Sequence, residues 1–123
     1  MITIMPESSG KNTGFLIRGK LTDEDYRKTL VPVLEKALEE HGRINIMFKM
    51  ENFEGWTPHA AWDDFVNWPK IAAVNKAAVV FDEKWDEFMS WLFKSYALIS
   101  HIDMKFFKED RIDEAWEWLR SGK

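Results

Sequence analysis

Residues 44–50 read Ile-Asn-Ile-Met-Phe-Lys-Met, and this stretch decides the fold. Its even-numbered positions are all large and apolar, while the odd-numbered positions mix polar and apolar residues. A repeat of two is typical of a β-strand with one buried face. A strand covered by helices on both faces is apolar throughout. The stretch therefore predicts a sheet with its helices mainly on one face.

Four further strands follow on either side of this one. Residues 1–5 alternate, residues 15–20 are expected to form a second strand, and the Pro-, Ser- and Gly-containing residues between them predict an antiparallel hairpin. Residues 77–81 are continuously apolar, which is typical of a buried parallel strand. Residues 104–107 predict the last strand.

Helices are predicted between these strands. Thr22 is an N-cap followed by three acidic residues, Pro32 is expected to kink or split the helix, and Gly42 ends it. Its apolar positions repeat at helical spacing: Tyr26, Leu30, Val33, Leu34, Ala37 and Leu38.

Three more helices complete the pattern. They are expected to start at Thr57-Pro58, Asp82 and Asp110, the first with an interruption at Pro69. Their inner faces are Ala61, Phe65, Trp68 and Ala72; then Trp85, Phe88, Met89, Leu92 and Tyr96; then Ile112, Ala115, Trp116 and Leu119. The fold class is therefore α/β, with the order β-β-α-β-α-β-α-β-α and a mainly parallel mixed sheet.

Composition excludes several classes of protein. A chain of 123 residues fits one domain, residues 1–123, and the lack of cysteine excludes disulfides and cysteine-based metal sites. A net charge of −4 argues against a nucleic-acid partner. No apolar run is long enough to span a membrane, and no signal peptide precedes the first strand, so we expect a cytoplasmic protein.

Four segments carry a resemblance to a known family. They are Gly-Lys-Leu-Thr-Asp-Glu-Asp-Tyr at 19–26, Leu-Val-Pro at 30–32, Glu-Gly-Trp-Thr at 54–57 and Phe-Asp-Glu-Lys-Trp at 81–85. In this order they resemble the SpoIIAA-like proteins of the STAS and CRAL-TRIO fold group, over about residues 15–119. The resemblance implies a mixed sheet with helices mainly on one face and an interaction or ligand-binding domain, not an enzyme.

Two positions depart from the fold group. The anti-sigma-factor antagonists carry a phosphorylatable Asp-Ser pair where this chain has Glu54-Gly55-Trp56-Thr57-Pro58. A phosphorylation switch is therefore not expected. Phe81 stands where relatives often have glycine, which narrows any site at that strand end.

The predicted site is the loop 51–59, at the carboxyl end of a central strand and at a helix N-terminus, where open α/β sheets bind ligands. The expected ligand-binding residues are Glu54, Trp56, Thr57, His59, Asp82 and Trp85. The alternative is that Thr57 is only a helix cap and that Trp56 only packs on a neighbour.

Seven tryptophans and nine phenylalanines are more than packing alone requires. One interpretation is an aromatic cleft between the second and third helices that holds an apolar or lipid-like ligand. The other is core packing plus a dimer contact, with Trp91 and Trp118 as exposed interface residues.

No catalytic pattern is present. The histidines are scattered at positions 41, 59 and 101, so no metal site is expected, and no motif implies a cofactor. The sequence predicts a non-catalytic regulatory or interaction module that binds a protein partner and forms a homodimer. The alternative is a binder of a small apolar or lipid-like molecule.

Overall fold

Five strands form one mixed sheet in the order β1-β2-β3-β4-β5. The computed structural model describes residues 2–57, 65, 67–81 and 100–121, with the backbone alone at 53 and 55–57. The strands are β1 (Ile2–Ile4), β2 (Asn12–Thr22), β3 (Ile44–Thr57), β4 (Val74–Phe81) and β5 (Asp103–Lys108). β1 is antiparallel to β2 and every other pairing is parallel, which confirms the predicted hairpin and the mainly parallel sheet.

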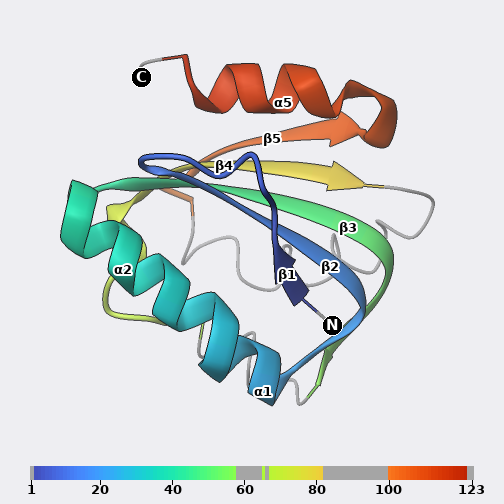
Figure 1. The fold of residues 1–123 in the computed structure, drawn as a ribbon, viewed down its shortest axis with the longest axis horizontal. Helices are drawn as coiled ribbons and strands as arrows, with labels where there is room; N and C mark the ends of the chain where they lie inside the picture. Colours follow the sequence, from blue (N-terminus) through green and yellow to red (C-terminus); the bar gives the residue numbers. More distant parts are fainter. Residues whose placement is uncertain (1, 58–64, 66, 82–99, 122–123) are drawn as a thin grey trace.

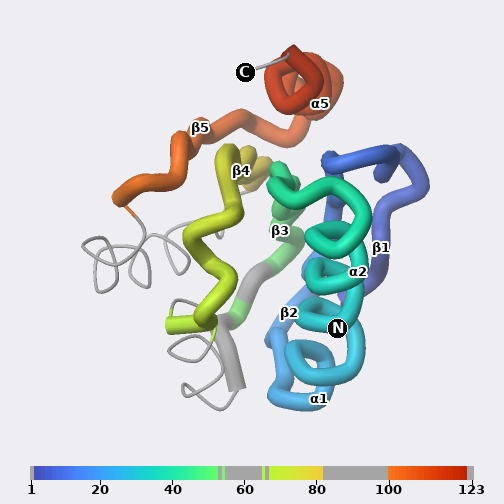
Figure 2. The backbone as a smooth tube through the Cα atoms, turned by 90° about the vertical axis from the view of Figure 1, so that its left-hand side faces the viewer, coloured from blue at the N-terminus to red at the C-terminus, as the bar shows by residue number. Residues whose placement is uncertain are grey.

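The described helices cover both faces of the sheet. α1 (Asp23–Asp25) and α2 (Val31–His41) lie along one face, and α5 (Ile112–Leu119) lies along the other (Figure 1). Seen from the side, the strands follow one another from β5 to β1 (Figure 2). The second predicted helix is described only at Phe65 and from residue 67 onward, and the third falls within 82–99, outside the described residues.

Two apolar clusters lie on the two faces of the sheet. On the α2 face, Phe15, Ile46 and Phe48 are buried against Leu30 and Leu34. On the α5 face, the buried residues include Met47, Ala78 and Val80 from the sheet and Ala115, Trp116 and Leu119 from the helix.

The mixed face of β3 is the face under α5. Asn45 and Met47 are fully buried there, whereas Lys49, farther along β3, is only partly buried. The odd-numbered face of β3 is therefore fully covered at Asn45 and Met47 and only partly covered at Lys49.

The helical segment 23–41 is irregular, as Pro32 predicted. A π-helical turn, Tyr26–Leu30, joins α1 to α2, and the amide of Val31 donates to the carbonyl of Tyr26. Pro32 has no amide proton and its ring crowds the preceding turn. The wider turn relieves that conflict. Gly42 ends α2 with φ 75°, the left-handed conformation expected of it.

Proline also changes the segment before β4. Trp68 is buried, but Pro69 lies in a turn and Ile71–Ala73 forms a short 3₁₀ turn. The expectation that the second helix continues to Ala72 is therefore wrong, because Pro69 ends helical hydrogen bonding. α5 likewise begins at Ile112, after the 3₁₀ turn Glu109–Arg111, and not at Asp110.

The start of α1 is a capping box. The Thr22 hydroxyl accepts from the Asp25 amide at 3.1 Å, and the Asp25 carboxylate accepts from the Thr22 amide at 3.1 Å. We expect Thr22→Ala to lower the free energy of unfolding by about 1 kcal/mol, because the Asp25 amide loses its partner. Denaturant titration measures the loss. Thr22→Ser keeps the hydroxyl and is the control; equal losses in both variants would contradict the capping role.

Candidate functional site

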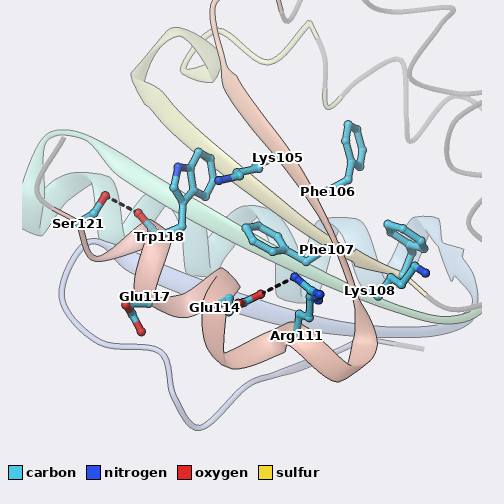
Figure 3. Close-up of a pocket in the computed structure, with 10 residues that line it drawn as sticks. Lys105, Phe106, Phe107, Lys108, Arg111, Glu114, Glu117, Trp118 and Ser121 are labelled. Carbon is cyan, nitrogen blue, oxygen red and sulfur yellow. Dashed lines mark hydrogen bonds and ion pairs between the residues drawn. The ribbon is translucent and has the colours of Figure 1, made fainter.

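A groove of about 790 Å³ lies between β5 and α5 (Figure 3). Strand β5 is the last in the sheet order, so the groove lies at an edge of the sheet. Its lining comes from β4 and β5, with Phe81, Lys105, Phe106, Phe107 and Lys108, and from the segment that carries α5, with Arg111, Glu114, Glu117, Trp118 and Ser121.

Trp118 forms an aromatic wall of this groove. It packs on Phe107 with ring centroids 6.2 Å apart. The ammonium of Lys105 lies 5.8 Å from the Trp118 ring centroid and 5.6 Å from that of Phe107, within the range of cation–π attraction. The groove therefore combines an apolar surface with positive charge.

Trp118 is partly buried, and the expectation that it is exposed is wrong. It lies three residues after the fully buried Ala115, so it flanks the inner stripe of α5. This position lets its ring reach Phe107. Its role as an interface residue stays a prediction, and Trp91 lies outside the described residues.

Charges line both sides of the groove. Lys105, Lys108 and Arg111 contribute three cations, and Glu114 and Glu117 contribute two carboxylates. Arg111 and Glu114 form an ion pair at 3.5 Å, with both side chains at least 60% exposed, and such a pair is weak. The lining therefore carries a net charge of +1, three cations against two carboxylates, on a chain whose net charge is −4.

The C-terminal end of α5 is held by two buried polar side chains of the sheet. Lys76 donates to the Trp118 carbonyl at 3.1 Å and to the Ser121 hydroxyl at 2.9 Å, and Asn45 donates to the Leu119 carbonyl at 3.2 Å. Asn45 and Lys76 are opposite each other in the β3–β4 pairing. A cation at the negative end of a helix is favourable. These contacts fix the helix that carries Trp118.

Sequence reasoning missed this attachment. Part of the signal was present, since Asn45 and Lys76 are polar residues beside the apolar stretches of their strands. Nothing local shows, however, that the two positions are neighbours or that a helix that follows them by 42 and 74 residues ends against them.

The predicted ligand loop 51–59 is strand as far as Thr57, so the expectation of a loop there is wrong. The pairing passes from Arg18–Glu51 to Lys20–Gly55, so three residues of β3 lie opposite Gly19. Gly19 and Asn52 have φ values of 63° and 51°. Positive φ in both strands permits a bulge, after which pairing resumes. The turn-forming residues are present, but in the structure they form a bulge within a strand.

The predicted ligand residues do not line the groove in the described part of the chain. Glu54 is exposed, and its carboxylate lies 3.7 Å from where a Cβ on Gly19 would stand. Trp56 and Thr57 pair with Leu21 and Thr22. Three other predicted ligand residues lie outside the described residues: His59, Asp82 and Trp85. Their role in binding stays a prediction.

Glu51 sits between two cations beside the bulge. Its carboxylate accepts from Lys49 at 2.8 Å and from Arg18 at 2.9 Å. The hydrogen bond from Lys49, followed by that from Arg18, holds the pKa of Glu51 below its ordinary value of 4.5. The carboxylate is thus kept ionised in a charged cluster, away from the groove lining.

This lowered pKa predicts a pH-dependent contribution to stability. In the unfolded chain Glu51 protonates near its ordinary pKa of 4.5, whereas in the folded protein it stays ionised to lower pH. Its contribution to folding stability is therefore complete above pH 4.5 and is lost as the pH falls through the lower folded pKa. We expect Glu51→Gln to be less stable than wild type at neutral pH and to converge with it in acid. Urea titrations across pH measure this. Glu39→Gln, at an exposed position, is the control, and a gap independent of pH would contradict the assignment.

Within the described ranges, no group of three histidine or carboxylate side chains has an arrangement that would hold a metal ion. No helix in the same ranges is long and apolar enough to cross a membrane.

Comparison with known proteins agrees with this architecture. The family model described as SpoIIAA-like matches residues 13–120. A solved structure of an uncharacterized protein from Shewanella loihica PV-4, of the DUF3478 family with a SpoIIAA-like fold, is similar with a TM-score of 0.67 and 29% identity, over 96% of this chain and 93% of that one. No curated protein matches the chain. The five-stranded mixed sheet and the extent of the family match together show that this chain belongs to the SpoIIAA-like family.

Proposed function

We propose that this protein is a non-catalytic regulatory module that binds a protein partner through the groove between β5 and α5. The observation that carries the proposal is the groove itself, in which the partly buried Trp118 and the buried Phe107 adjoin exposed cations. Tryptophan and arginine are the residues that contribute most to protein interfaces. Glu114 and Glu117 in the groove lining are both exposed. Exposed carboxylates suit recognition of a partner better than proton transfer.

The rigid attachment of α5 supports the same function. Trp118 is presented by a helix whose last turn is bound by Lys76 and Asn45. A side chain that is already ordered loses less conformational entropy when a partner binds. The groove therefore offers a surface that needs little rearrangement.

Differential capture tests this proposal. Tagged wild type, a Lys105→Glu/Lys108→Glu variant and a Lys11→Glu/Lys36→Glu control are incubated with extract of the source organism. All four positions are exposed, and both double variants change the charge equally. We expect one partner to be retained by wild type and control and lost by the groove variant, and the purified pair to form a complex in sedimentation. Equal retention by all three would overturn the proposal.

The alternative of an apolar or lipid-like ligand places it between helices that fall largely in 58–64 and 82–99, outside the described residues. It stays a prediction, as does the homodimer. Native mass spectrometry of protein purified from cells addresses the ligand, and sedimentation addresses the dimer.

A further inference from the structure

We infer that the partner segment is an extended strand that adds to the outer edge of β5 and carries two carboxylates separated by two apolar residues. This rests on the proposed function and names the chemistry of its partner. The inference starts from the lining of the groove, which includes four consecutive residues of β5, Lys105 to Lys108.

Four consecutive strand residues do not share one face. Side chains alternate between the two faces of a strand, so Lys105 and Phe107 point to the α5 face while Phe106 and Lys108 point to the other. Figure 3 shows Phe107 turned toward Trp118 and Phe106 turned away from it. Because residues of both faces line one groove, the groove follows the edge of β5.

Because β5 lies at the edge of the sheet, its outer side carries the backbone N–H and C=O groups with which an added strand would form hydrogen bonds. Strand β5 pairs with β4 from Lys76–Asp103 to Phe81–Lys108, and within the described chain no strand lies beyond it. An added strand takes its affinity from hydrogen bonds with such an edge, and its specificity from the side chains opposite. Phe106 is 39% exposed, so it presents apolar surface beside that edge.

The side chains of β5 determine what fits opposite. The order at 105–108 is Lys-Phe-Phe-Lys, and cross-strand partners stand about 5 Å apart between Cβ atoms. The complementary order is carboxylate, apolar, apolar, carboxylate. This order reads the same in both directions, so it applies to a parallel or an antiparallel partner. Arg111, also in the lining, is paired with Glu114 at 3.5 Å, so the two lysines carry the charge complementarity.

A second copy of β5 is a poor occupant. Two copies paired through residues 105–108 would place lysine opposite lysine, which is destabilising. Lysines on an edge strand protect it from pairing with itself. The same lysines attract an acidic strand, so the charge favours a different protein as the partner.

Peptide titration followed by NMR amide shifts tests the inference. Three acetylated and amidated peptides are compared, with the cores Glu-Val-Val-Glu, Lys-Val-Val-Lys and Glu-Val-Pro-Glu. We expect the first alone to shift the amides of β5, with binding at least about tenfold tighter than the second and weakened by salt. The proline peptide is expected not to bind, because proline has no main-chain N–H to donate to the ladder.

Charge reversal provides the decisive comparison. In Lys105→Glu/Lys108→Glu the preference is expected to pass to the lysine peptide, whereas Lys11→Glu/Lys36→Glu keeps the wild-type preference. Equal binding of the proline peptide, or shifts away from β5, would overturn strand addition. If a captured partner depends on the groove but no acidic peptide binds, the inference fails and the proposed function stands. If neither partner nor peptide binds, both fail.

Discussion

Gly14→Ala is expected to lower the free energy of unfolding by about 1 to 3 kcal/mol, although alanine is normally the better strand residue. Gly14 lies in β2 under α5, and a Cβ there would stand 2.6 Å from Cη2 and 2.8 Å from Cζ2 of Trp116. Trp116 is 3% exposed, so its ring has no free space to enter. The overpacking cost exceeds the gain of about 0.5 to 1 kcal/mol from replacing glycine within a strand. Chemical denaturation measures the net change.

A compensating variant makes this prediction specific. Trp116→Phe removes the outer ring atoms that the new methyl group would meet, so the double variant should be more stable than the sum of the two single changes predicts. Gly10→Asn is the control, because nothing lies within 4 Å of a Cβ there and asparagine tolerates its φ of 57°. Additive losses would show that Gly14 and Trp116 do not compete for the same space.

Lys76→Met is expected to destabilise the protein by about 1 to 3 kcal/mol and to loosen α5 selectively. Methionine fills a similar volume, but the Ser121 hydroxyl loses the ammonium as its donor, and the Trp118 carbonyl is left with the donors of Ser121, whose hydroxyl lies 2.7 Å away. Lys76 is 3% exposed, so water cannot easily replace the ammonium group. Hydrogen exchange at α5, together with urea unfolding, measures both effects.

The control for Lys76 is Lys36→Met, at an exposed position on α2, which should change stability by less than about 0.5 kcal/mol. A buried cation also carries a desolvation cost that methionine removes. If Lys76→Met matched wild type in stability and in exchange at α5, apolar packing and Asn45 would suffice to hold the helix, and the groove wall would not depend on Lys76.

Local patterns explain how much of the fold was predictable. The alternation at 44–50 identified the buried even-numbered face of β3, but it did not show that Asn45 and Met47 on the other face are fully buried as well. Thr22 and Gly42 marked the ends of the first helical segment, because capping and left-handed backbone depend on a few adjacent residues. Pro32 predicted the irregular turn before it, because a proline acts on the turn that directly precedes it.

The candidate site was predicted poorly, because it depends on contacts between distant segments. The turn signals at 51–57 were read as a loop, yet pairing with β2 carries them into a strand with a bulge at Gly19. Trp118 was expected at the surface, yet Phe107 and Lys76 lie against its ring. Neither outcome follows from the residues next to each position.

The sequence by itself determined the five strands, the first and last helical segments, the hairpin at the start of the sheet, the even-numbered buried face of β3 and the inner face of α5, since each depends on spacing and on neighbouring residues. Only the tertiary structure decided that Asn45 and Lys76 meet the last turn of α5, and that Lys105, Lys108 and Trp118 border one groove. The physical reason is sheet register. It brings together side chains that lie tens of residues apart, and no local pattern in the chain encodes that meeting.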